Sequence, residues 1–103
     1  HERFLAPLQP GPMEITLPDG RSEWAAIAGG VAEVTGTQVV VLVDECFKAH
    51  EIDLESARHT RDEAERELKS LLEEIDQEER RARLEDTIVR ASVQIEVHGR
   101  LHS

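Results

Sequence analysis

Residues 39–57 read VVVLVDECFKAHEIDLESA and contain the change that decides the fold. The first five residues are β-branched or leucine and apolar on both faces, which favours an interior β-strand. Beyond Asp53, apolar and small residues recur at gaps of three and four, which is typical of an amphipathic helix. The sequence therefore predicts a β portion, residues 1–50, and a helical portion, residues 51–103, joined at residues 51–53.

Glycine and proline divide the first portion into short segments. Pro18-Asp19-Gly20 predicts a turn, Gly29-Gly30 predicts a bulge or tight connection, and residues 35–37 predict a second turn. The expected strands cover residues 13–17, 24–28, 31–34 and 38–43. Closely spaced strands of this kind predict an antiparallel meander within a sandwich or barrel. About 50 residues make a thin core, so we expect further strands before His1 or a partner over one face.

The second portion predicts two helices. Asp53 is a suitable N-cap, and Asp76 and Glu79 have the spacing of a capping box after a break at residues 74–76. The first apolar stripe consists of Leu54, Ala57, Arg61, Ala64, Leu68, Leu71 and Ile75, and the second consists of Leu84, Ile88, Ala91 and Ile95. Two matching stripes with a short connection predict an antiparallel hairpin. The predicted fold class is thus α+β, a β-sandwich that is partial at its N-terminus followed by a two-helix hairpin.

Two details of the hairpin have alternatives. Arg61 lies on the stripe itself, so its side chain must either extend outward or meet an acid from the other helix. Residues 93–97 alternate apolar and polar side chains like a strand. Because Val89, Val93 and Val97 also have helical spacing, we expect a helix there.

Composition excludes several classes of function. The 103 residues carry a formal net charge of −10, distributed over both portions, which makes nucleic acid an improbable direct partner. The single cysteine cannot form an internal disulfide, and no zinc-binding spacing of cysteines occurs. No apolar run approaches the ~18 residues that span a bilayer. We therefore expect no direct insertion into a membrane.

The residues that could bind a metal or act as a nucleophile have structural interpretations that are simpler than a catalytic or metal-binding role. His98 and His102 have the i, i+4 spacing of a metal-binding pair, but without a third ligand their favourable interaction with a helix C-terminus is the preferred interpretation. Cys46 lacks a basic neighbour and is expected to be a small apolar filler. No acid–base pair, activated nucleophile or metal triad can be assembled, so we expect no enzyme and no cofactor.

The order of several short motifs resembles one family. Ala28-Gly29-Gly30-Val31-Ala32-Glu33-Val34 precedes the 39–43 strand, and Ile52-Asp53 opens the first helix. This order, preceded by Pro10-Gly11 and followed by an alanine- and arginine-rich hairpin, is similar to the epsilon subunit of F-type ATP synthases, called delta in mitochondria. Residues 1–5 resemble the family's His-Ala-Pro-Leu-Leu segment, with Glu2 and Arg3 departing from it. By this resemblance the family's first strands would precede His1.

The resemblance implies a non-catalytic rotor subunit of a proton-translocating ATP synthase. Its sandwich would bind the gamma subunit and the c-ring, and its hairpin would inhibit ATP hydrolysis when extended against the catalytic alpha and beta subunits. The implied location is peripheral, on the cytoplasmic side of the bacterial inner membrane or on the matrix or stroma side in organelles. The implied partner-binding residues are His1, Arg80, Arg81, Arg83 and Arg90.

Some members of this family bind ATP through an Ile-Asp-x-x-Arg-Ala motif. Ile52, Asp53 and Ala57 match the motif here, but Ser56 replaces its arginine, so we expect no tight ATP binding. The alternative function is an unrelated adaptor, in which a β module recruits a protein partner through its helical hairpin.

Overall fold

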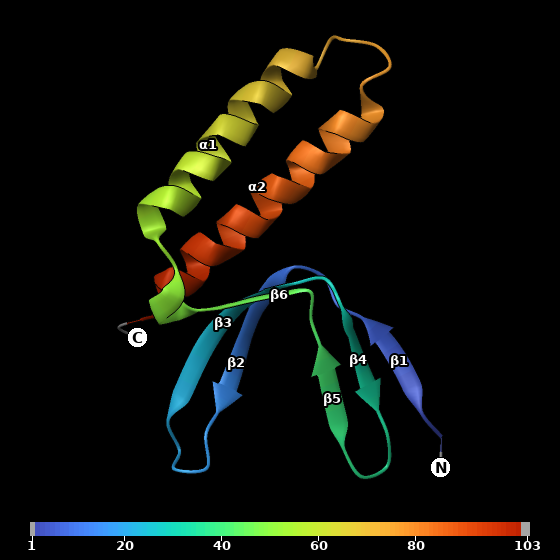
Figure 1. Ribbon diagram of the computed structural model, residues 1–103, viewed down its shortest axis with the longest axis vertical. Helices are drawn as coiled ribbons and strands as arrows, with labels where there is room; N and C mark the ends of the chain where they lie inside the picture. Colours follow the sequence, from blue (N-terminus) through green and yellow to red (C-terminus); the bar gives the residue numbers. More distant parts are fainter. Residues whose placement is uncertain (1, 102–103) are drawn as a thin grey trace.

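The computed structural model describes residues 2–101, in which six strands precede two long helices (Figure 1). The strands are β1 (Phe4–Pro7), β2 (Gly11–Thr16), β3 (Ser22–Ala28), β4 (Val31–Val34), β5 (Val39–Leu42) and β6 (Glu45–Lys48). A short 3-10 turn, η1 (Ala49–Glu51), leads into α1 (Leu54–Leu71) and α2 (Glu78–His98). The α+β class, with a β-sandwich followed by a helical hairpin, is confirmed.

The strands form two three-stranded antiparallel sheets, in the orders β1-β4-β5 and β2-β3-β6. The predicted meander is therefore wrong, because β3 and β4 follow one another in the chain but belong to different sheets. Gly29 and Gly30, with φ of 72° and 101°, lie at the corner between them. Their positive φ values redirect the chain from one sheet to the other, which a side chain with a Cβ would resist. The tight connection predicted at this pair is confirmed.

The strand predicted to be interior lies at an edge. β5 pairs only with β4 among the described strands, and Val39 and Leu42 are 62% and 61% exposed. The register places Phe4, Val39 and Val41 on one face of that sheet, and all three are exposed. A run of β-branched residues favours a strand but does not determine which neighbours cover it. That further strands or a partner cover one face stays a prediction.

Cys46 is exposed on β6, an edge strand of the other sheet, so its predicted role as a small apolar filler is wrong. An edge position leaves a small side chain with neighbours on one side only. The turn at Pro18-Asp19-Gly20 is confirmed, since the Gly20 amide donates to the Leu17 carbonyl at 2.9 Å. The turn after β4 is also confirmed, because the Thr35 amide donates to the Gln38 carbonyl at 2.9 Å.

The two helices form the predicted antiparallel hairpin (Figure 1). The Asp53 carboxylate accepts a hydrogen bond from the Ser56 amide at 3.1 Å, so the predicted N-cap is confirmed. Residues 93–97 are helical, as expected. On the stripes, Ala57, Ala64 and Ala91 are buried, and these small residues permit close approach of the helices.

Two predictions about the connection between the helices are wrong. Ile75 is 83% exposed, because α1 ends at Leu71 and the apolar stripe ends with it. Asp76 does not cap α2, whose N-cap is Gln77 without a side-chain hydrogen bond. Asp76 instead has φ of 59°, a left-handed conformation in which it forms part of the turn itself.

Candidate functional site

The hairpin is attached to the strands at two places. One attachment is covalent and runs through η1 and residues 52–53 into α1. The other is formed by packing, where the C-terminal turns of α2 reach β3 (Figure 1). A small apolar cluster fills this second attachment. Its buried members are Ala26, Ala49, Ile52 and Val97, with Trp24 and Val93 packed against them.

The geometry of β3 explains why the cluster forms here. Trp24 and Ala26 are two residues apart on one strand and therefore face the same side of the sheet. Val97 is 0% exposed and is the largest fully buried side chain of the described residues. The cluster also includes Ala49 and Ile52 from the connecting segment. The β portion and the hairpin therefore share one core at this point.

Two polar contacts flank the apolar cluster. Arg90 of α2 places Nη1 3.4 Å from a carboxylate oxygen of Glu45 on β6, while its Nε lies 2.8 Å from Asp86 on its own helix. At the other end, the guanidinium carbon of Arg100 lies 4.0 Å from the centroid of the Trp24 ring. These contacts connect the hairpin to the strands on either side of Val97.

The predicted partner-binding arginines occupy different environments. Arg80 pairs with Glu67 of α1, and Arg83, whose side chain is 68% exposed, lies 3.9 Å from Glu79. Arg80 and Arg83 line one shallow hollow, and Arg83 and Arg90 line the next, so these three follow one side of α2. Arg81 is directed elsewhere, because its Nη1 donates to the backbone carbonyls of Leu71 and Glu74 at 2.9 Å each. His1 lies outside the described residues.

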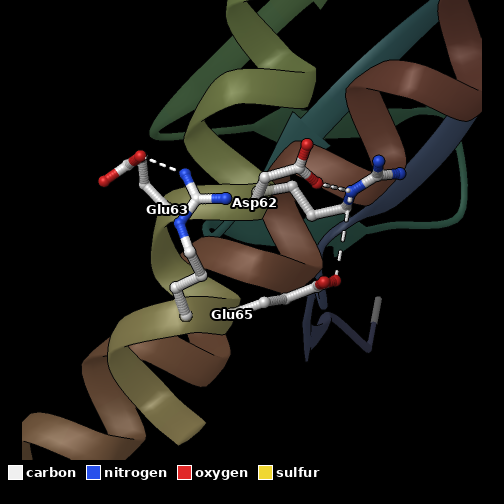
Figure 2. Close-up of polar contacts among 5 residues, drawn as sticks. Asp62, Glu63 and Glu65 are labelled. Atoms are coloured by element: carbon white, nitrogen blue, oxygen red, sulfur yellow. Dashed lines mark hydrogen bonds and ion pairs between the residues drawn. The ribbon is translucent and has the colours of Figure 1, made fainter. Parts of the chain in front are cut away.

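Of the two alternatives for Arg61, contact with an acid of the other helix is not found among the described residues. The Nε of Arg61 lies 3.1 Å from Asp62 and 3.9 Å from Glu65, both acids of its own helix. Figure 2 labels these two acids. Glu63, on the adjoining part of α1, pairs with Arg66. Acids at i+1 and i+4 are within reach of an arginine without any contribution from the second helix. Arg61 is thus neutralised within α1 and does not link the helices.

A cavity of about 200 Å³ lies between the two helices and β6. Hydroxyl and amide groups from Ser56, Thr60, Thr87 and Gln94 contribute to its lining, together with Ala57, Ala91, Glu45 and Arg90. Arg90 is the one cationic residue of this lining, and it is paired with Glu45 and Asp86. Ser56 occupies the position at which the ATP-binding motif has arginine, and it lines this cavity. This position therefore provides a hydroxyl group instead of a positive charge.

Only one member of the histidine pair considered for metal binding lies within the described residues. No group of three or more histidine, cysteine or acidic side chains within residues 2–101 is arranged to hold a metal ion. His98 is the last residue of α2, whereas His102 lies outside the described residues. No helix in the described part of the chain is long and apolar enough to cross a membrane.

Sequence reasoning did not anticipate the contact between Trp24 and Arg100. The only available signal was the single tryptophan of the chain, followed by the small residues Ala25 and Ala26. Small residues on a strand leave room for a helix to approach, and a tryptophan beside them offers a flat surface. The partner, however, lies near the opposite end of the chain, and no local pattern identifies it.

Comparisons with known proteins agree with this architecture. Residues 1–49 match the family model for the ATP synthase delta/epsilon chain, beta-sandwich domain. The ATP synthase epsilon chain of Xanthomonas campestris pv. campestris (strain B100) is 34% identical over 101 residues, which cover 98% of this chain and 69% of that protein.

The protein belongs to the ATP synthase epsilon-chain family.

The epsilon chain of Stenotrophomonas maltophilia (strain K279a) is 35% identical over 89 residues, or 86% of this chain and 64% of that relative. This epsilon-family chain thus spans about two thirds of the length of these relatives. A chain in the cryo-EM structure of the Euglena gracilis mitochondrial ATP synthase, OSCP/F1/c-ring in rotational state 1, superimposes with a TM-score of 0.71 and 26% identity. That match covers 93% of this chain and 57% of the Euglena chain.

Proposed function

We propose that this protein is a non-catalytic central-stalk subunit of a proton-translocating F-type ATP synthase. Its β-sandwich would join the gamma subunit to the c-ring, on the cytoplasmic face of the membrane or its organellar equivalent. The observation that supports this proposal most directly is membership of the epsilon-chain family. The match to a chain of an F1/c-ring assembly adds support for the same partners.

The proposal includes regulation of ATP hydrolysis by the hairpin. The hairpin is joined to the strands by one covalent segment and by the small cluster around Val97. Burial of a few side chains of this size contributes on the order of a few kcal/mol, of which ordering and polar desolvation offset a part. A contact of this strength permits a docked and a released state to coexist, so that a binding partner can shift the population between them.

The arginines of α2 are proposed contacts for acidic surfaces of the catalytic alpha and beta subunits. Arg83 is the best suited, because its side chain is largely exposed and its pairing with Glu79 is weak at 3.9 Å. Arg80 and Arg90 would first exchange their present acidic partners. Arg81 would act indirectly by holding the turn, and His1 would contribute from the sandwich side.

The experiment that tests the proposal combines co-purification with a hydrolysis measurement. A tagged version of the chain should co-purify with the gamma subunit and the c-ring. Deleting residues 53–103 should leave that association intact and should raise the rate of ATP hydrolysis by the assembled complex. Recovery of the truncated subunit with the complex is the control, since it separates loss of inhibition from loss of the subunit.

Two outcomes would contradict the proposal in different ways. If gamma and the c-ring do not co-purify, the rotor assignment fails and the adaptor alternative gains support. If the truncated subunit assembles but hydrolysis is unchanged, the assignment stands and the regulatory part fails. Arg83→Gln offers a finer test, because it should relieve inhibition without disturbing the contacts within the hairpin.

Nucleotide sensing is not part of the proposed regulation. A triphosphate needs several cations and backbone donors, whereas the cavity beside Ser56 offers one arginine that is already paired. Isothermal titration of the full chain with ATP and Mg²⁺ should show no binding in the micromolar range. Measured micromolar affinity would overturn this prediction and would direct attention to Arg90 as the phosphate ligand.

A further inference from the structure

The contact between Arg100 and Trp24 lies just after α2, beside the apolar cluster that joins the hairpin to β3. Arg100 follows α2, and its backbone amide donates to the Val97 carbonyl at 3.0 Å, so the position of the guanidinium depends on the last helical turn. The guanidinium carbon lies 4.0 Å from the Trp24 centroid. This is well within the ~6 Å range over which a cation is attracted to an aromatic face.

The surroundings favour a cation at this position. A cavity of about 530 Å³ is bordered by Trp24, Arg100, Lys48 and the acids Glu14 and Glu23. Glu14 is the cross-strand partner of Trp24 and therefore lies on the same face of the sheet. Glu96, one turn earlier on α2, places Oε1 3.3 Å from Nη2 of Arg100. Glu23 is paired with Lys48 at 3.3 Å, whereas Glu96 contacts the guanidinium directly.

We propose that Arg100 and Trp24 form a latch that holds the hairpin against the β-sandwich. In the docked state the guanidinium stacks on the indole, next to the buried Val97. When α2 leaves β3, the indole loses this cover while the covalent connection through residues 49–53 remains. Arg100 would thereby take part in the regulation of ATP hydrolysis proposed above. The physiological effect of the latch rests on that proposed function.

The Arg90–Glu45 pair, the other polar contact between the hairpin and the strands, is less suited to act as a latch. Both side chains of the Arg90–Glu45 pair are about one-third exposed, and their closest atoms are 3.4 Å apart. Arg90 also retains Asp86 as a partner at 2.8 Å when the hairpin is released. Salt weakens a partly exposed ion pair of this length. Arg100 likewise keeps Glu96 of α2 at 3.3 Å, but its contact across the junction is with an aromatic face, which the single tryptophan of the chain provides.

The test measures opening of the junction in the full-length protein. Cys46, which is exposed, is replaced by serine, and Ala26→Cys places one thiol beneath α2, where the alanine is 4% exposed. An aromatic disulfide reagent then labels the introduced thiol only when the hairpin is released. Arg100→Met keeps the length of the side chain and removes its charge. We expect this variant to be labelled about fivefold faster, which corresponds to about 1 kcal/mol in the opening equilibrium.

Matched variants make the result specific. Arg100→Lys retains a cation and should stay within about twofold of the parent rate. Arg58→Met removes an exposed guanidinium that pairs with Glu55 of its own helix at 3.0 Å, and it should leave the rate unchanged. In a Trp24→Leu background, Arg100→Met should cause no further increase. Acrylamide quenching of Trp24, the only tryptophan, provides a second measurement of the same opening.

The latch is overturned if Arg100→Met leaves labelling unchanged, or if it accelerates labelling equally with and without Trp24. An equal effect of Arg58→Met would also overturn it, because the response would then follow net charge. None of these measurements involves ATP hydrolysis. Failure of the latch is therefore distinguishable from failure of the proposed regulation, which would appear as unchanged hydrolysis after truncation.

Discussion

Single residues control the places where this chain changes direction. Gly30 has φ of 101°, and a Cβ built there would overlap the Leu42 carbonyl oxygen and approach the Val43 Cα at 2.7 Å. Both of these neighbours are backbone atoms that cannot rotate away. The glycine is thus required by conformation and by space together. Its location between β3 and β4 means that the relation of the two sheets depends on it.

Gly30→Ala should lower the free energy of unfolding by at least about 2 kcal/mol, because the new methyl group adds a steric overlap to an unfavourable φ. The measurement is the midpoint of urea unfolding. Gly36→Ala is the matched control, since nothing lies within 4 Å of a Cβ at that glycine. The control should change stability by less than about 0.5 kcal/mol. Equal effects at both positions would show that the corner is not specifically constrained.

At the scale of elements, the ends of the helices are stabilised by different means. Asp53 caps the N-terminus of α1, because its carboxylate accepts a hydrogen bond from the Ser56 amide. This interaction is local and can be predicted from the sequence. The C-terminal end of α1 is instead stabilised by Arg81 of α2, whose guanidinium binds the carbonyls of Leu71 and Glu74. The Leu71 carbonyl also accepts the Glu74 amide at 3.1 Å, and Arg81 adds a charged donor from the second helix to this turn. Arg81 therefore fixes the turn of the hairpin.

Arg81→Ala should cost about 1.5 to 3 kcal/mol, because two carbonyls lose a charged donor. Hydrogen exchange should show faster exchange at residues 68–77 while the strands are unaffected. Arg83→Ala is the control, since its exposed side chain makes only a long contact with Glu79. If exchange at the turn is unchanged in Arg81→Ala, the two hydrogen bonds do not hold the hairpin together.

At the scale of the whole molecule, the β portion and the hairpin are connected through one small core. The extents of 50 × 37 × 15 Å describe a flat molecule, in which the helices extend away from the strands (Figure 1). Val97 of α2 is 0% exposed and belongs to the same cluster as Ala26 of β3. The cluster therefore couples the stability of the two portions, although each has its own regular structure.

Val97→Ala should destabilise the protein by about 2 kcal/mol, because it removes two buried methyl groups and leaves a cavity. Thermal unfolding followed by helical circular dichroism and by Trp24 fluorescence should shift together. Val89→Ala is the control on the same helix, since Val89 is 46% exposed and should have little effect. Independent shifts of the two signals would show that the portions unfold separately.

The sequence by itself determined four of the six strands, the turns of the β portion, the N-cap of α1 and the antiparallel hairpin. Each of these depends on periodicity or on residues within four positions of one another, so the interactions are local. Tertiary structure decided that β4 pairs with β1 rather than β3, that the 39–42 strand lies at an edge, and that Arg81 and Arg100 meet Leu71 and Trp24. These outcomes depend on contacts between residues that are far apart in the sequence. The free energy of such contacts is not reflected in any local sequence pattern, so it cannot be predicted from periodicity or spacing.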